Sequence, residues 1–160
     1  MSLKFYNTLS RSLDPFVPLE EGKVRIYACG PTVDAHAHSG NFRSFMAFDL
    51  LHRYLEWKGF EVTFVRNFTD VDDKTIAGAN AADMTIAEFT PRFADEILQQ
   101  ERLLGIRPVD AYPRATDYIE EMVAWVRRLE ERGLAYATDD GSVWFSISKF
   151  PDYGQLSRID

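Results

Sequence analysis

The 160-residue sequence is poor in cysteine and in positive charge, and each shortage narrows the classes of protein that it can be. Cys29 is the one cysteine, so no disulfide can form within the chain, as is typical of a reducing compartment. The chain has 18 Lys and Arg against 25 Asp and Glu, a formal net charge of -7. This acidic balance argues against wholesale contact with a phosphate backbone, and so against this chain being the main RNA-binding part of a protein.

Long apolar runs are also lacking. The first residues, Met1 to Phe5, contain no apolar segment of the kind found in a secretion signal, and no run approaches the length that spans a bilayer. We therefore expect a soluble, cytoplasmic protein with no membrane partner. Neither a Gly-x-Ser-x-Gly elbow nor a Walker loop is present, which argues against a nucleophilic hydrolase and a P-loop NTPase.

The composition that is present favours a packed globule. Hydrophobic residues make up 46% of the chain and aromatic residues 14%, with 12 Phe. The first half predicts a strand at 24–28, a helix from 40 to 58 closed by Gly59, and a strand at 60–65. One face of the helix carries Phe45, Phe48, Leu51 and Leu55, spaced by three and four. Strand, helix and strand in this order predict an α/β fold with a Rossmann-type parallel sheet.

The remaining segments predict further elements around this unit. We expect a short strand at 4–9, a short helix ending at Ala79, and helices at 86–104 and 118–132. Asp139-Asp140-Gly141 between two short apolar runs is typical of a β-hairpin. The pattern of residues along the chain changes near Arg114. We therefore predict a first domain at 1–114 and a helix-plus-hairpin segment at 115–160. A parallel sheet with so few strands would be incomplete.

The turn Cys29-Gly30-Pro31-Thr32 follows the first strand of the predicted sheet. Ligands of open α/β sheets bind outside the carboxyl ends of the strands, so this turn lies where a ligand-binding site is expected. A thiolate there could bind zinc. The alternative is that Cys29 is a small buried apolar residue.

Polar residues gather at the start of the long helix. His38 and Asn41 are three residues apart and face the same side of the first turn. Free backbone N–H groups at a helix N-terminus favour a phosphate, and Gly40 lets a ligand approach closely. The alternative is that Ser39 or Asn41 only caps the helix, and that His38 is an ordinary polar residue.

A third polar group, Asn67-Phe68-Thr69-Asp70, follows the second strand. Thr69 and Asp72 resemble a capping box, which would be a purely structural role. Asp70, Asp72 and Asp73 could suggest a metal site, but the glycine and glutamate of a calcium loop are missing.

The three groups together resemble one family. The run Tyr27-Ala28-Cys29-Gly30-Pro31-Thr32-Val33, then His38-Ser39-Gly40-Asn41, then the run from Val65 to Lys74, is similar to the cysteinyl-tRNA synthetases in order and spacing. Later landmarks are Arg114-Ala115-Thr116, Gly133-Leu134-Ala135-Tyr136 and Tyr153-Gly154-Gln155-Leu156-Ser157. The resemblance covers essentially the whole chain and implies a class I synthetase with a Rossmann-type catalytic domain and a connective insertion.

The resemblance also implies roles for individual residues. Cys29 would be the first ligand of a zinc ion that binds the substrate thiolate, and residues 38–41 would be the His-Ile-Gly-His signature that cradles ATP. His38 and Asn41 would act in catalysis, with His38, Ser39, Gly40 and Asn41 binding ATP with Mg²⁺. The cysteine and adenylate pocket would be lined by Gly30, Thr32, Ser44, Asn67 and Thr69. Three positions depart from the family pattern, namely Asp34 for Tyr, Ser39 for an apolar residue and Asn41 for the second His.

The family's other zinc ligands, its second Rossmann half and its Lys-Met-Ser-Lys-Ser loop would lie beyond Asp160. We therefore expect this chain to be part of a cysteine–tRNA ligase, to bind zinc poorly and to activate cysteine little by itself. Its partners would be cysteine and ATP, with tRNA(Cys) in a full-length enzyme that acts as a monomer. Two alternatives stay open, a cysteine-activating ligase of mycothiol-type synthesis and a non-catalytic nucleotide-binding or scaffold protein.

Overall fold

The computed structural model describes residues 3–158, which divide into two compact units. One unit is Pro18–Tyr118, and the other comprises the described parts of Met1–Val17 and Ile119–Asp160. The first strand-forming residues thus group with the carboxyl-terminal segment, which the sequence did not indicate. The predicted division into a catalytic part at 1–114 and a connective segment at 115–160 follows from the family resemblance and stays a prediction.

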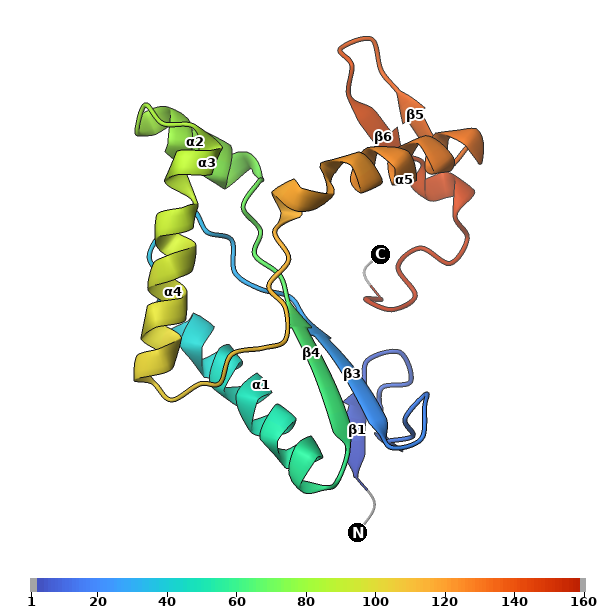
Figure 1. Cartoon of the computed structure of the whole chain (residues 1–160). Coiled ribbons are helices and arrows are strands. Elements are labelled where there is room, and N and C mark those ends of the chain that lie inside the picture. The colour runs from blue at the N-terminus through green and yellow to red at the C-terminus, as the bar shows by residue number, and fades with distance from the viewer. Residues whose placement is uncertain (1–2, 159–160) are drawn as a thin grey trace. The chain divides into compact units, whose positions relative to one another are not determined.

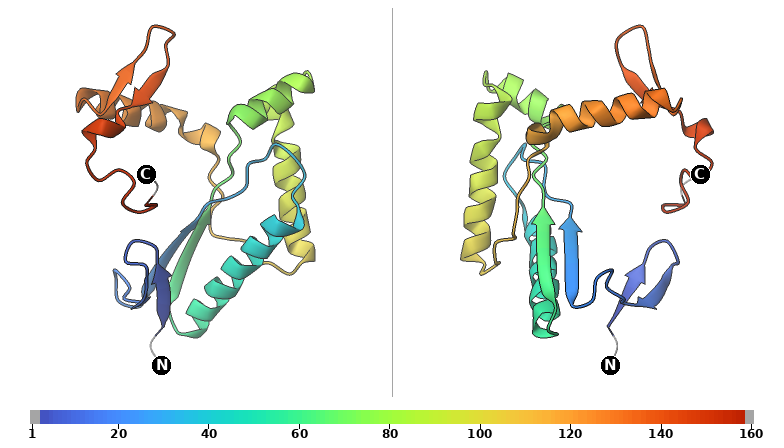
Figure 2. Two further views of the ribbon diagram at one scale, coloured as in Figure 1. Left: turned by 180° about the vertical axis from the view of Figure 1, so that it is seen from behind. Right: turned by 45° about the vertical axis from the view of Figure 1, so that its right-hand side comes forward.

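A parallel pair of strands forms the centre of the larger unit. Strand β3 (Lys23–Ala28) pairs with β4 (Glu61–Arg66) in a register that runs from Lys23 opposite Glu61 to Ala28 opposite Arg66. Helix α1 (Ser39–Trp57) connects the two strands and lies along one face of the pair, as Figures 1 and 2 show. The predicted βαβ unit and the α/β class are therefore confirmed.

A third extended segment, residues 110–115, continues the sheet beyond β4. It forms parallel bridges that pair Val65 with Ala111 and Phe68 with Arg114. The Arg66 N–H donates to the Ala111 carbonyl at 3.1 Å, and the Phe68 N–H donates to the Pro113 carbonyl at 2.9 Å. No strand pattern is visible in the sequence here, because Pro113 interrupts it and cannot donate to a ladder.

Helix α1 contributes the face that the spacing of its apolar residues predicted. Phe45 and Leu55 are buried, and Phe48 and Leu51 are half-buried. Gly59 has φ +92°, the left-handed conformation that ends the helix as predicted. The core of this unit also draws on the later helices and loops, and its buried members are Val33, Phe45, Phe68, Ala79, Phe89, Phe93, Ala94, Ile97 and Ile106.

The helix predicted at 86–104 is wrong as a single element. Helix α2 (Asp73–Ala81) is followed by a short α3 (Ile86–Phe89) and by α4 (Pro91–Leu103). Pro91 lacks an N–H and so cannot continue the hydrogen-bonded ladder of α3. It instead occupies the first turn of α4, where that N–H would be unpaired in any case.

A buried ion pair joins β4 to α4. Arg66 and Glu101 are 2% and 3% exposed, and Arg66 Nη2 lies 2.5 Å from Glu101 Oε1. The two opposite charges form an ion pair within the core. The guanidinium also stacks over the Phe45 ring, with its carbon 4.1 Å from the ring centroid. Burial raises the pKa of Glu101, and the charge of Arg66 opposes that rise.

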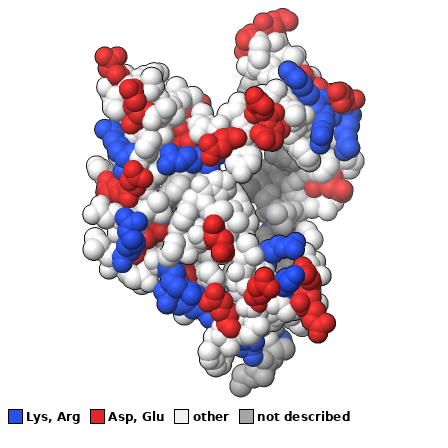
Figure 3. All heavy atoms as spheres, viewed as in Figure 1, with Lys and Arg blue, Asp and Glu red and all other residues white. Residues whose placement is uncertain are grey.

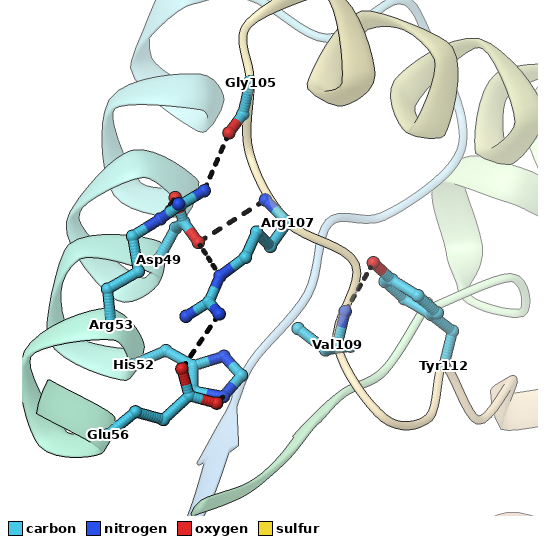
Figure 4. A network of polar contacts seen from close by, with 8 residues as sticks. All are labelled: Asp49, His52, Arg53, Glu56, Gly105, Arg107, Val109 and Tyr112. Atoms are coloured by element: carbon cyan, nitrogen blue, oxygen red, sulfur yellow. Dashed lines mark hydrogen bonds and ion pairs between the residues drawn. The ribbon is translucent and has the colours of Figure 1, made fainter.

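A second polar network ties α1 to the loop after α4 (Figure 4). Asp49 accepts a hydrogen bond from Arg53 Nε at 2.8 Å and forms an ion pair with Arg107. Arg107 Nη1 donates to Glu56 at 2.9 Å, and this bond lowers the pKa of Glu56. Arg53 Nη2 also reaches the Gly105 carbonyl at 3.0 Å. The loop is therefore held along two turns of α1.

The smaller unit contains two hairpins and one long helix. Strands β1 (Lys4–Asn7) and β2 (Ser12–Pro15) pair antiparallel, so the predicted strand at 4–9 is shorter and Asp14 and Pro15 belong to a strand, not a loop. A 3₁₀ turn η1 (Ala115–Tyr118) precedes α5 (Ile119–Glu131). Strands β5 (Ala135–Ala137) and β6 (Val143–Phe145) form the predicted hairpin, followed by the turn η2 (Ile147–Lys149).

The surface carries charges of both signs. On the face drawn in Figure 3, Lys and Arg are interspersed with Asp and Glu and form no continuous basic patch. This mixing agrees with the net charge of -7. No helix within residues 3–158 has the length and apolarity needed to cross a membrane.

Candidate functional site

The turns that follow β3 and β4 lie side by side and extend the parallel pairing past the ends of the strands. Thr32 and Thr69 form a parallel bridge. The Thr69 N–H donates to the Pro31 carbonyl, and the Val33 N–H donates to the Thr69 carbonyl, both at 3.1 Å. Two segments that are separate in sequence thus form one polar edge at the carboxyl ends of the strands, which is where α/β sheets bind ligands.

Gly30 and Asn67 fix the distance between these two turns. The Gly30 N–H donates to Asn67 Oδ1 at 2.8 Å, and Asn67 Nδ2 donates to Thr69 Oγ1 at 3.3 Å. A Cβ atom on Gly30 would lie 1.5 Å from the backbone oxygen of Asn67. No side chain fits in that space, so the turn requires glycine at this position.

His38 is the N-cap of α1, and its bonds determine which tautomer it adopts. Its Nδ1 accepts a hydrogen bond from the Gly40 N–H at 3.1 Å, and the Asn41 Oδ1 accepts from the His38 N–H at 3.0 Å. Because Nδ1 is an acceptor here, the hydrogen of the neutral ring is on Nε2, which can donate to a ligand. The alternative of a capping role therefore holds for Asn41, which forms the cap together with His38, and not for Ser39.

A polar cavity of about 340 Å³ opens beside this helix start. It brings together three of the predicted site residues, Thr32, His38 and Asn41. The complete lining is Pro31, Thr32, Asp34, Ala35, His36, Ala37, His38, Asn41, Lys74 and Ile97. Helix α1, the turn after β3 and the start of α2 therefore all contribute to one space.

The other predicted site residues lie outside this cavity lining. Gly30, Asn67 and Thr69 make the contacts within and between the two turns. Ser44 Oγ donates to the Gly40 carbonyl at 3.4 Å, within α1. Ser39 lines a separate, mostly apolar cavity of about 470 Å³ with Phe42, Arg43, Met46 and Leu104.

Two cavity residues were not singled out from the sequence as site residues. Lys74 is exposed at the start of α2 and reaches the same cavity as His38. A signal for it existed, because it ends the polar run that begins at Asn67. His36 also lines the cavity, and only its position two residues before His38 pointed to it.

Cys29 lies at the end of β3 and is exposed, so the alternative of a buried apolar cysteine is wrong. Its Sγ atom is 3.6 Å from the Gly30 carbonyl. Among residues 3–158, no group of three or more His, Cys, Asp or Glu side chains is placed to bind a metal ion. These residues therefore do not fit a zinc site, because zinc in proteins takes three or four protein ligands.

The acidic residues after β4 have structural partners. Asp70 is 2% exposed and accepts hydrogen bonds from the Thr116 N–H at 3.0 Å and the Thr116 hydroxyl at 2.6 Å. Asp72 is the N-cap of α2 and accepts from the Thr75 N–H at 2.8 Å. The capping box predicted for Thr69 and Asp72 is therefore wrong, since the box is formed by Asp72 and Thr75.

Comparison with known protein families gives a match to the tRNA synthetase class I (C) catalytic domain over residues 15–160. A cysteine–tRNA ligase of Thermococcus kodakarensis is 45% identical over 99% of this chain and 33% of its own length. A cysteine–tRNA ligase of Legionella pneumophila is 46% identical over 99% of this chain and 35% of its own length. The chain thus spans about a third of the curated relatives that it matches.

Solved structures support the same fold. Mycobacterium tuberculosis methionyl-tRNA synthetase, determined in complex with methionyl-adenylate, aligns with a TM-score of 0.62. The alignment covers 70% of this chain and 23% of that protein, with 23% sequence identity. At this identity the likeness concerns the fold, and it agrees with the Rossmann-type architecture expected from the sequence.

Proposed function

This chain belongs to the class I (C) tRNA synthetase catalytic domain family, and on that premise we propose that it supplies part of the site at which a cysteine–tRNA ligase activates cysteine with ATP. The observation that carries the proposal is the polar cavity that joins Thr32, His38, Asn41 and Lys74 at the carboxyl edge of the sheet. Its donors suit the phosphates of a nucleotide.

The proposed reaction requires no nucleophile from the protein. An oxygen of the cysteine carboxylate attacks the α-phosphorus of ATP, the bond to the bridging oxygen breaks, and pyrophosphate leaves with that electron pair. The protein contributes by positioning the two reactants and by stabilising negative charge that develops on the phosphates. ATP would enter with Mg²⁺, which brings its own charge to the phosphates.

His38, Asn41 and Lys74 are the residues we assign to the phosphates. The tautomer of His38 presents an Nε2 hydrogen, and Asn41 keeps both amide hydrogens because only its Oδ1 is used in the cap. Lys74 contributes a positive charge from the start of α2. Hydrogen bonds from such groups to a charged oxygen are stronger than those between neutral groups.

The turns after the two strands are assigned to the amino acid and the adenylate. Gly30, Thr32, Asn67 and Thr69 form the floor of this region, and Ser44 lies one turn into α1. The Gly30–Asn67 contact holds the floor in one shape. Cys29 is an exposed thiol beside it, and the described residues supply only this one thiolate, too few ligands for zinc.

The activities of a longer protein are part of the same proposal. Transfer of cysteine to tRNA(Cys), a monomeric state and a cytoplasmic location are expected of a full-length ligase. A cysteine-activating ligase that acts on an amino sugar would share this half of the site. Charging of tRNA by a full-length protein that contains this chain would separate the two, since only the tRNA ligase would give cysteinyl-tRNA.

The experiment that tests the proposal is titration of ATP into this chain, followed by backbone amide NMR, together with an assay of ATP–pyrophosphate exchange. We expect ATP to shift the amide signals of residues 38–41 and 74, with little or no exchange in the presence of cysteine. An absence of ATP binding would contradict the proposed function. Exchange with cysteine but not with serine would show that the site is complete without further ligands.

An alternative scaffold role has one observation in its favour. Met46, Leu50 and Trp57 are 51%, 69% and 77% exposed at helical spacing on α1, which leaves an apolar stripe in contact with solvent. A scaffold would use such a stripe to bind another chain. Sedimentation analysis of the purified chain would test this, because a monomer at high concentration would count against self-association.

A further inference from the structure

We propose that His36, held in place by Glu96, is a further phosphate-binding residue of the cavity and contacts the triphosphate of the nucleotide. This inference rests on the proposed function, because it takes ATP as the ligand. It adds a residue at a position where the resemblance assigned no role. It also gives Glu96 a positioning role on α4, the helix that already contributes Ile97 to the cavity lining.

The first step of the argument is that the His36 ring is fixed although it is exposed. Its side chain is 77% exposed, yet Nδ1 lies 2.6 Å from Glu96 Oε2. The Glu96 carboxylate is itself held, because its other oxygen accepts a hydrogen bond from Gln100 Nε2 at 2.7 Å. The ring also packs edge-on against Phe93, with centroids 5.5 Å apart. An exposed side chain with two such contacts, one of them to a carboxylate that is itself held, is ordered before any ligand arrives.

The second step is the direction of the hydrogen bond. An ionised carboxylate only accepts, so His36 Nδ1 carries a hydrogen and donates it to Glu96. Among the described residues, Nε2 has no hydrogen-bond partner. Nε2 is therefore the ring nitrogen left for a ligand, and an imidazolium ring between Glu96 and an oxyanion would donate through Nδ1 to the one and through Nε2 to the other.

The third step is the set of residues that line the cavity together with His36. It lines the same cavity as His38 and Lys74, which also donate hydrogen bonds. Asp34 is the one acidic residue of the lining and opposes an anion. The nitrogen-bearing side chains of His36, His38, Asn41 and Lys74 outnumber the carboxylates of Asp34 and Glu96, and this favours an anionic ligand such as a triphosphate over a neutral one.

The test is calorimetric titration of inorganic triphosphate, ATP and adenosine into this chain and its variants at fixed ionic strength. We expect His36→Phe to weaken inorganic triphosphate and ATP about tenfold, the usual effect of losing one charge-assisted hydrogen bond, and to leave adenosine unchanged. His36→Gln, which restores an N–H donor, should recover part of the loss. Glu96→Gln should weaken triphosphate by less than His36→Phe, because its amide oxygen still accepts from Nδ1.

The matched control is Lys58→Gln. Lys58 caps the far end of α1, about 30 Å from His38 at 1.5 Å per residue, so this variant removes a positive charge without touching the cavity. An equal loss in Lys58→Gln, an equal loss for adenosine, or no loss in His36→Phe would each overturn the role of His36. Failure of the unmodified chain to bind ATP or triphosphate would instead overturn the proposed function as well.

Discussion

The amide oxygen of Asn67 accepts a hydrogen bond from the backbone N–H of Gly30 at 2.8 Å, across 37 residues of sequence. This bond joins the turn after β3 to the turn after β4, and it sets the floor of the candidate site. The contact is close enough that Gly30 has no room for a side chain. Several expected properties of the protein depend on this junction and on the ion pair beside it.

Gly30→Ala should destabilise the chain and distort the site. The new Cβ would lie 1.5 Å from the Asn67 backbone oxygen, so the two turns must separate. We expect a loss of about 3 kcal/mol in the free energy of unfolding, measured by urea denaturation. Gly22→Ala is the control, because Gly22 has φ +75° and nothing within 4 Å, so it should lose only about 1 kcal/mol. Equal losses in the two variants would contradict the steric explanation.

Arg66 and Glu101 should behave as a coupled pair. Arg66→Met leaves a buried carboxyl without its partner, and Glu101→Leu leaves a buried guanidinium without its partner. Each should lose about 3 kcal/mol of unfolding free energy, whereas the double variant should lose less than the sum. Urea denaturation of all four proteins gives the coupling energy. Simple additivity would mean that the two side chains do not interact across the 2.5 Å contact.

The stability of the protein should fall with rising pH in the range where Glu101 ionises. Burial raises its pKa above the ordinary 4.5, so the folded form keeps the proton to a higher pH than the unfolded form does. Its contribution is therefore fully present below about pH 4.5 and is lost as pH rises through the folded pKa. Glu56 acts in the opposite sense at lower pH, because its pKa is lowered by Arg107.

Glu101→Gln isolates this effect, since the amide does not ionise. Between about pH 4.5 and pH 7, the unfolding free energy of the unmodified chain should fall relative to that of Glu101→Gln. The same difference measured in Glu61→Gln, at an exposed carboxyl of β4, serves as the control. Parallel pH profiles for the unmodified chain and Glu101→Gln would show that Glu101 ionises normally in the fold.

Asp49→Asn should loosen the loop after α4 from α1. Asp49 is 13% exposed and pairs with both Arg53 and Arg107 (Figure 4). We expect a loss of about 1 kcal/mol in the free energy of unfolding, smaller at high salt because partly exposed ion pairs are screened. Asp95→Asn on α4 is the comparison, because that exposed carboxylate has no ion pair among the described residues. A loss that does not change with salt would point to packing instead of charge.

Zinc should bind this chain weakly. Cys29 supplies one thiolate, and the described residues offer no cluster that would complete a zinc site. Competition with a chromophoric chelator should give a dissociation constant no tighter than micromolar, and Cys29→Ser should change it little. A tight site that Cys29→Ser abolishes would mean that other residues of this chain, or a second copy, provide the missing ligands.

The sequence alone determined the elements whose signals are local. The apolar spacing of α1, the left-handed Gly59 at its end and the strand patterns of β3 and β4 each depend on neighbouring residues, so the βαβ unit could be predicted. The same holds for the residues His38 to Asn41 at the start of α1. Their order and spacing, together with the turns at Cys29 and Asn67, were enough to indicate the family.

Tertiary structure decided what depends on contacts between distant segments. Residues 110–115 extend the sheet only because β4 offers its edge, and Pro113 hides this in the sequence. His36 acquires its orientation from Glu96, 60 positions away, and Lys74 reaches the cavity because α2 starts beside α1. Helix and strand propensities carry no information about which side chains a fold brings together, so the folded chain was needed to place these residues at one cavity.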